Sequence, residues 1–250
     1  MRQICIYLLL LISVNLQAQT IKIAAAGNLQ FVLDEIKTKY GTLHPKTEII
    51  VNIGSSGSLF QQITNGADFD LFMAADKIYP EKLKTQGLVA GKVIIYAYGK
   101  LVMWSNTLDV SKGINILTDK SVTRIAIAKP DIAPYGDRAI QCLNYYHLFD
   151  KVKEKVVYAD NIAQAAQYAQ TGNAEIGFLA LALVMSPGMK GSCFILDPIS
   201  YQPVEQGLVL IKSEQANPQA SEFVKFLLSA DCKLVFEKYG YMVPGVGDLR

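Results

Sequence analysis

The chain has 250 residues, 51% of them hydrophobic, with 24 Lys and Arg against 22 Asp and Glu for a formal net charge of +2. A balance this close to neutral gives no reason to expect nucleic acid or an acidic membrane surface as a partner. The two histidines and the absence of paired Cys/His spacing argue against a zinc site, so we expect neither a metal centre nor a cofactor.

Residues 1–18 read as a signal peptide. Arg2 supplies the positive charge, residues 4–16 the apolar run, and Ala18 the small residue before cleavage. The run is too short for a membrane span, and no later stretch is long and apolar enough for one. We therefore expect a mature periplasmic protein that starts near Gln19 and is not an integral membrane protein.

The mature chain keeps three cysteines, Cys142, Cys193 and Cys232. An oxidising compartment permits one disulfide among them, but their spacing predicts no particular pair. No cysteine stands at the cleavage point, so we expect a free protein without a lipid anchor.

Strand and helix patterns alternate along the mature chain, which is typical of an α/β protein with mainly parallel sheets. The expected strands are 20–26, 47–53, 69–73, 92–104, 123–128, 156–158, 175–183 and 206–211. The expected helices are 29–41, 59–65, 80–86, one through Ile140, Leu143 and His147, then 162–171, 218–228 and a last one ending at Tyr239.

Two junctions place a small polar side chain where a strand ends and a helix begins. Asn28 follows the first strand, and Ser56 follows the second within the run GSSGS. The first N–H groups of a helix are unpaired and carry partial positive charge, so such a junction suits an anion. The alternative is that Asn28 and Ser56 only cap their helices, as these residue types commonly do.

Two further junctions, 129–136 and 160–162, have the same strand-to-helix position. Ligands of open α/β sheets bind beyond the carboxyl ends of the strands, so all four junctions are expected to converge on one cleft. Tyr135 brings a phenol donor to the third junction.

Six segments resemble, in order, the periplasmic molybdate-binding proteins of ABC importers. They are AAAGNL at 24–29, GSSGSL at 54–59, DFDLFMAAD at 68–76, PDIAPYG at 130–136, TGNAEIGF at 171–178 and FEKYGY at 236–241. The resemblance covers the whole mature chain. It implies a two-lobe periplasmic-binding-protein-like fold of class II with a hinge-closed cleft, and a monomer that delivers its cargo to the permease subunits of an importer.

The resemblance also implies the lobes and the ligands. Lobe I would be 19–98 and 204–250, and lobe II would be 99–203. The oxyanion would be bound by Asn28, Ser56 and Tyr135, and by the backbone N–H of Ile162. Ala180 stands where many members of the family carry a tyrosine. A phenol donor is therefore missing at that point, and Tyr135 is the candidate to replace it.

The chemistry of the junctions favours a fully deprotonated oxyanion. Molybdate, tungstate and sulfate accept hydrogen bonds only, which suits hydroxyls, amides and backbone N–H groups. Hydrogen phosphate keeps a proton and calls for a carboxylate acceptor, and only Asp131 and Asp160 stand at these junctions. The sequence ranks neither molybdate against tungstate nor either of them against sulfate.

The sequence leaves three other functions open. The same clamp could bind sulfate or another small anion. It could also bind iron, since the chain has thirteen tyrosines, among them the candidates Tyr145, Tyr146, Tyr239 and Tyr241. A serine hydrolase is the alternative of another class, but 54–57 does not fit the G-x-S-x-G elbow and no histidine is placed as a base. We therefore expect a binding protein and not an enzyme.

Overall fold

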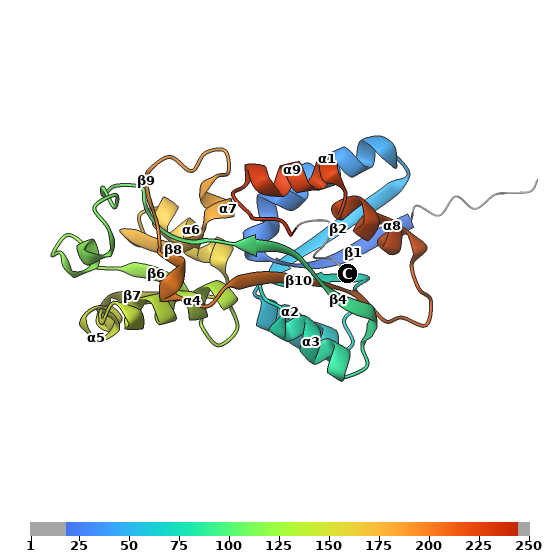
Figure 1. Cartoon of the computed structure of the whole chain (residues 1–250), viewed down its shortest axis with the longest axis horizontal. Coiled ribbons are helices and arrows are strands. Elements are labelled where there is room, and N and C mark those ends of the chain that lie inside the picture. Colours follow the sequence, from blue (N-terminus) through green and yellow to red (C-terminus); the bar gives the residue numbers. More distant parts are fainter. Residues whose placement is uncertain (1–18, 245–250) are drawn as a thin grey trace, which may run out of the picture.

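In a computed structural model, which describes residues 19–244, two mixed five-stranded sheets lie end to end with helices on both faces of each (Figure 1). The expected α/β two-lobe architecture is confirmed. The expected signal peptide, residues 1–18, lies outside the described residues.

The first sheet has the strand order β2-β1-β3-β10-β4. Its strands are β1 (Gln19–Ala26), β2 (Thr47–Gly54), β3 (Leu71–Met73), β4 (Val89–Gly99) and β10 (Val204–Ile211). β1 is parallel to both of its neighbours, whereas β10 is antiparallel to β3 and β4. Helices α1 (Gln30–Leu43), α8 (Pro218–Leu227) and α9 (Ala230–Lys238) cover one face, and α2 (Ser56–Thr64) and α3 (Ile78–Thr85) cover the other.

The second sheet has the order β7-β6-β8-β5-β9. Its strands are β5 (Leu101–Ser105), β6 (Ile125–Ala128), β7 (Val156–Ala159), β8 (Ile176–Ala180) and β9 (Ser192–Ile195). β6 is parallel to β7 and β8, and β5 is antiparallel to β8 and β9. The helices are α4 (Pro134–Tyr145), α5 (Phe149–Val152), α6 (Ile162–Gln170) and α7 (Leu181–Val184), with 3-10 turns at Gly27–Leu29, Ile114–Thr118, Lys153–Lys155 and Pro198–Ser200.

The chain crosses between the sheets twice. It leaves the first sheet at Lys100, between β4 and β5, and returns through 201–203 into β10. The strand region expected over 92–104, interrupted by Gly99, is thus two strands in different sheets. Gly99 still pairs with Val204 and Leu101 already pairs with Ala180, so the chain changes partner at Lys100. That 99–203 moves as one body against the rest stays a prediction.

Two further expectations need correction. The apolar run 175–183 is a strand only as far as Ala180, and its last residues form α7. A continuous apolar run does not distinguish a buried strand from a buried helical turn. α4 ends at Tyr145, and His147 lies beyond it with a φ of 53°. β9 was not expected, because its four residues carry no clear alternation.

The interior explains the apolar runs in the sequence. β1 lies inside the first sheet with helices on both sides, so Ile21 and Ile23 are fully buried. Strands of this kind are apolar on both faces. Ala26 and Ala75, at the ends of β1 and β3, pack into the hydrophobic cluster of the second lobe. The two lobes are therefore in contact where these strands end.

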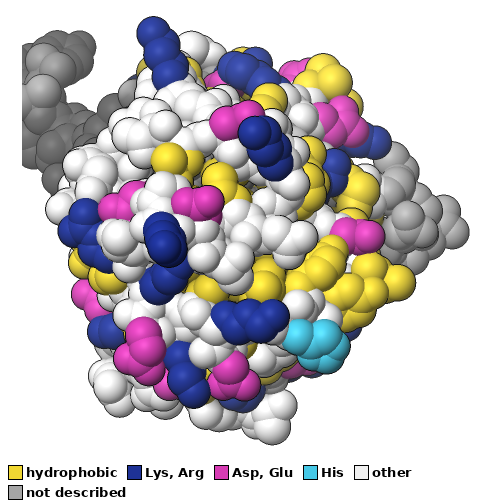
Figure 2. Space-filling model, turned by 90° about the vertical axis from the view of Figure 1, so that its left-hand side faces the viewer, with side chains coloured by type: hydrophobic (Ala, Val, Ile, Leu, Met, Phe, Trp, Pro, Cys, Tyr) yellow, Lys and Arg dark blue, Asp and Glu magenta, His cyan; other side chains and the backbone are white. Residues whose placement is uncertain are grey.

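The face seen in Figure 2 has no large patch of positive or negative charge, because basic, acidic and hydrophobic side chains are interspersed there. Among residues 19–244, no helix is long and apolar enough to cross a membrane. The three cysteines of this part of the chain are unpaired, and Cys142 and Cys232 are buried.

Candidate functional site

A small cavity of about 10 Å³ lies where the two lobes meet, which is about the room that one water molecule needs. The structure brings all four residues expected at the site, Asn28, Ser56, Tyr135 and Ile162, to the wall of this cavity. The remaining lining residues are Ala26, Gly27, Gly54, Ser55, Ala75, Ala133 and Pro134.

Ser56 is the first residue of α2 and is fully buried. It does not cap its helix, because Ser55 is the cap and its Oγ accepts the N–H of Ser58 at 3.3 Å. The Ser56 Oγ accepts the N–H of Ala75 at 2.9 Å instead. The hydroxyl hydrogen of Ser56 is then available as a donor, as is the backbone N–H at the start of the helix.

Asn28 is 1% exposed and lies in the 3-10 turn after β1, where it makes no cap. Its amide nitrogen donates to Oε1 of Gln206 at 2.8 Å and to the phenol oxygen of Tyr241 at 2.7 Å. The phenol of Tyr241 donates in turn to the backbone oxygen of Asn28 at 3.1 Å. The amide oxygen of Asn28 is buried and has no partner among the described residues.

Tyr135 is the second residue of α4, whose first residue is a proline. Proline has no N–H, and an N–H at that position would have no partner within the helix. The side chain is 1% exposed, and its hydroxyl has no partner among the described residues. Burial, with a smaller contribution from the Tyr241 phenol, raises the pKa of Tyr135 well above its ordinary value. The group is therefore a neutral O–H donor at any physiological pH.

Ile162 is the first residue of α6, which Asn161 caps by accepting the N–H of Gln164 at 3.0 Å. The cap leaves the backbone N–H of Ile162 for another acceptor. Gly27 lies against this helix start so closely that a Cβ at residue 27 would be 3.1 Å from the nitrogen of Ala163. A side chain at residue 27 would therefore require the start of α6 to shift by a few tenths of an ångström.

The cavity has no charged side chain in its wall. Three helices, α2, α4 and α6, start there and contribute the partial positive charge of their first turns. Asp131 and Asp160, the acidic residues considered from the sequence, do not line it, and Asp160 pairs with Lys129 at 2.5 Å. The site suits an anion that accepts hydrogen bonds and brings its own charge.

Contacts across the cleft hold the lobes together in this arrangement. The N–H of Gly57 donates to the backbone oxygen of Ile132 at 2.8 Å. The Tyr79 phenol donates to the backbone oxygen of Asp131 at 3.0 Å. Both bonds join the α2–α3 side of the first lobe to the 129–136 loop of the second, so the structure describes a closed clamp.

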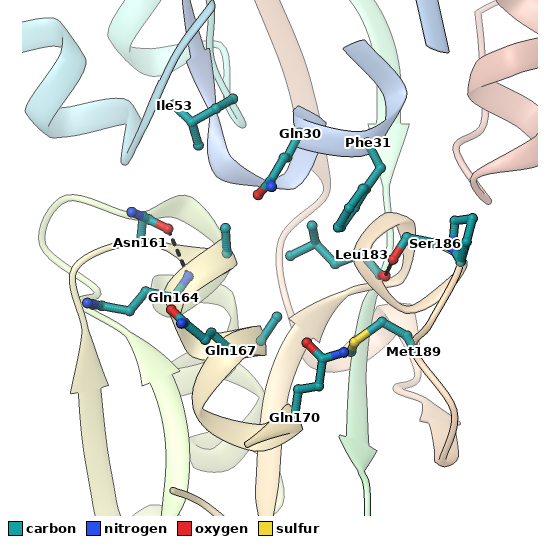
Figure 3. A pocket seen from close by; sticks show the side chains of 13 residues that line it. Gln30, Phe31, Ile53, Asn161, Gln164, Gln167, Gln170, Leu183, Ser186 and Met189 are labelled. Carbon is teal, nitrogen blue, oxygen red and sulfur yellow. Dashed lines mark hydrogen bonds between the residues drawn. The ribbon is translucent and has the colours of Figure 1, made fainter. Parts of the chain in front are cut away.

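A larger open groove lies beside the cavity (Figure 3). Gln30 and Phe31 face it from α1, and the amides of Gln164, Gln167 and Gln170 from α6. The Asn161 side chain accepts the N–H of Gln164, and the Ser186 hydroxyl donates to the oxygen of Leu183. None of the four residues expected at the site lines this groove.

Sequence reasoning missed two residues behind the cavity, Gln206 and Tyr241. Both are buried, at 0% and 4% exposure, and both contact Asn28. A signal existed for each: Gln206 is an amide directly before the apolar run 207–211, and Tyr241 closes the segment 236–241. Neither signal specifies a partner 178 or 213 residues away in the chain.

Residues 21–242 match the family model described as bacterial extracellular solute-binding protein. The chain is 36% identical over 231 residues to a molybdate-binding protein of Azotobacter vinelandii, which covers 90% of each chain. It is also 36% identical over 193 residues to a molybdate-binding protein of Rhodobacter capsulatus, which covers 76% of this chain and 75% of the relative.

The chain also resembles solved structures of binding proteins. The periplasmic molybdate-binding protein of A. vinelandii superposes with a TM-score of 0.85 at 32% identity, covering 90% of this chain and 100% of the other. The sulfate-binding protein SubI of Mycobacterium tuberculosis superposes with a TM-score of 0.71 at 12% identity, covering 92% of this chain and 88% of the other. At that identity the second likeness concerns the fold alone.

Proposed function

This chain belongs to the family of bacterial extracellular solute-binding proteins, among its molybdate-binding members, and from that premise we propose that it captures molybdate or tungstate between its lobes and delivers it to the permease of an ABC importer. It is a binding protein and not an enzyme.

One observation supports the ligand class above all others. The hydroxyl of Tyr135 is a buried donor without a partner among the described residues, and Tyr135 lines the small cavity. A buried polar group that stays unpaired costs about 1–3 kcal/mol. An unpaired donor beside three helix starts is explained by a small ligand that accepts hydrogen bonds.

We assign Asn28, Ser56, Tyr135 and the backbone N–H of Ile162 as the donors. The first two belong to the first lobe and the last two to the second. A tetrahedral dianion bonded to all four is desolvated only when the lobes meet, so binding selects the closed arrangement. The permease can then distinguish loaded from unloaded protein by its shape.

The two chain segments that cross between the lobes are the natural hinge. We propose that 99–203 rotates against 19–98 and 204–250 about the chain at 99–101 and 201–204. We further propose that the protein is exported to the periplasm as a monomer after cleavage near Ala18. Mass spectrometry of the secreted protein checks the last point, since a mature chain beginning at Gln19 is expected.

A thermal-shift panel with molybdate, tungstate, sulfate, phosphate and ferric citrate tests the ligand. A tight ligand at about a hundred times its dissociation constant adds roughly 2.7 kcal/mol of stability. We expect that response to molybdate and tungstate. An equal response to sulfate would contradict the specificity, and a response to ferric citrate alone would contradict the oxyanion class.

A further inference from the structure

Two buried side chains behind the cavity, Gln206 and Tyr241, take up both hydrogens of the Asn28 amide nitrogen. The bonds are 2.8 Å and 2.7 Å long, within the usual range for such groups. The amide oxygen, in contrast, has no partner although Asn28 is 1% exposed. The amide nitrogen of Asn28 is thus fully bonded within the protein, whereas its amide oxygen is left unpaired among the described residues.

Local backbone features position the side chains of Gln206 and Tyr241 beside Asn28. The pairing of β10 with β4 shifts register between Gln206 and Gly207. Such a bulge changes the direction in which a strand presents its side chains. Tyr241 follows Gly240, whose φ is 80°, and the next residue, Met242, pairs with Tyr98 in β4 through bonds of 2.7 and 3.0 Å. Both partners of Asn28 therefore sit beside the strands that cross between the lobes.

A dianion in the cavity would be repelled by an amide oxygen and attracted by an amide N–H. Gln206 and Tyr241 can each donate as well as accept, because one has an amide and the other a phenol. The remaining bonds of the Gln206 amide nitrogen, to the oxygens of Ala75 and Val204, are long at 3.4 and 3.5 Å. Reversal turns the Gln206 amide oxygen towards these two carbonyl oxygens and takes the Tyr241 hydroxyl from the backbone oxygen of Asn28, so the bonds that Asn28 gains to the oxyanion must outweigh these losses.

We propose that Gln206 and Tyr241 are positioning residues, and that they reverse their hydrogen bonds to Asn28 when the oxyanion binds. In the reversed state the Asn28 oxygen accepts from the Tyr241 hydroxyl and the Gln206 amide. The two N–H groups of Asn28 then point at the oxyanion. No proton is transferred; the amides turn and the phenol hydrogen changes acceptor. The inference rests on the proposed oxyanion function and adds the groups that aim its donor.

A double-mutant cycle on the whole mature protein tests this, with molybdate affinity measured by titration calorimetry. We expect Tyr241→Phe to weaken binding about tenfold, since it removes a single bond to the aimed amide. Asn28→Ala weakens it by about as much or more. The double variant is then no weaker than Asn28→Ala alone, because Tyr241 acts only through Asn28. Two independent effects would instead multiply to about a hundredfold, and that result would overturn the proposal.

Tyr96→Phe is the matched control. Tyr96 is a buried phenol without a partner among the described residues. Its ring packs on Phe236 at 5.4 Å between ring centroids, and Tyr241 packs on the same ring at 5.6 Å. Tyr96 has no bond to Asn28, and we expect unchanged affinity. Gln206→Met repeats the cycle from the other side with similar side-chain volume, and thermal midpoints without ligand verify that each variant folds.

The two proposals fail in different ways. A wild-type protein that binds no oxyanion overturns the proposed function and this inference together. A wild-type protein that binds molybdate, with additive effects of Tyr241→Phe and Asn28→Ala or with no effect of Asn28→Ala, overturns the positioning role alone.

Discussion

The phenol of Tyr135 lies against the backbone of Gly99, and a Cβ at residue 99 would stand 2.0 Å from the phenol oxygen. Gly99 ends β4, the strand that leaves the first lobe, whereas Tyr135 belongs to α4 of the second. The contact therefore ties a proposed ligand of one lobe to the crossing strand of the other. Glycine is required here for space, since no positive φ accompanies it.

Gly99→Ala should weaken molybdate binding about tenfold or more, the equivalent of about 1.4 kcal/mol. The added methyl group displaces the Tyr135 hydroxyl, and one lost bond to a charged ligand is worth roughly 1.5–3 kcal/mol. Titration calorimetry measures the change.

Gly41→Ala is the control for this change. Gly41 lies in α1, and a Cβ there would meet nothing within 4 Å. We expect unchanged affinity and a gain in stability of about 0.5–1 kcal/mol, because alanine favours a helix over glycine. If the two variants bind molybdate equally well, the position of the Tyr135 phenol does not matter for binding.

Tyr135→Phe should change stability and affinity in opposite directions. Without ligand, the variant loses a buried hydroxyl that has no partner in residues 19–244, so its free energy of unfolding should stay equal or rise by about 1 kcal/mol. With molybdate, affinity should fall about tenfold. A denaturation curve and a titration on the same sample measure both, and a parallel loss of stability would indicate a structural role instead.

The sequence predicted the four junctions well because each is local chemistry, a strand followed by a small polar residue and a helix. It did not show that Ser55 and not Ser56 caps α2, since the two serines are adjacent and either can reach the third N–H. The sequence also did not predict the position of the Gln206 side chain. That position depends on the bulge in β10, which is a feature of the pairing of β10 with β4.

The order of strands and helices was predicted nearly throughout, and the errors share a cause. The run 92–104 is apolar on both sides of Gly99, and 175–183 is apolar on both sides of Ala180. In each case the chain changes its partner or its geometry while it stays buried. Hydrophobic periodicity indicates which residues are buried, but it does not indicate where the chain passes from one sheet to another.

Ser56→Ala should weaken molybdate binding about tenfold or more, or roughly 1.4 kcal/mol. It should also lower stability by about 1 kcal/mol without ligand, because the Ser56 Oγ accepts the N–H of Ala75 at 2.9 Å. Ser58→Ala is the matched control. Ser58 lies in the same helix, bonds only with Ser55 in the contacts described and does not line the cavity. Unchanged affinity in Ser56→Ala would remove Ser56 from the site.

Gly57→Ala should hinder closure without touching the ligand. A Cβ at residue 57 would lie 2.7 Å from the Tyr79 phenol oxygen and 2.9 Å from the Cα of Ile132, which is backbone of the opposite lobe. The lobes must then stay apart, so affinity falls about tenfold or more. Small-angle scattering with saturating molybdate should show a larger radius of gyration than in wild type. A radius equal to wild type would show that this contact does not limit closure.

Glu175 gives the fold a defined dependence on acid. Its burial raises the pKa, but hydrogen bonds from the N–H groups of Arg124 and Thr123 and from their side chains outweigh this, and the pKa falls from 4.5 to about 2. A carboxyl group with a lowered pKa in the folded state stabilises the fold above the unfolded pKa. That stabilisation is lost as the pH falls from about 4.5 towards 2.

Glu175→Gln should therefore lower the free energy of unfolding by about 2 kcal/mol at pH 7, and the difference from wild type should shrink below pH 4.5. The amide accepts one bond where the carboxylate oxygen accepted several, so the N–H groups at the start of β6 lose partners. Urea unfolding at a series of pH values measures this, with the exposed Glu154→Gln as control. Because Glu175 lies outside the cavity wall, molybdate affinity at pH 7 should not change. A stability difference that persists at pH 2 would mean that the charge of Glu175 is not what stabilises this end of the second sheet.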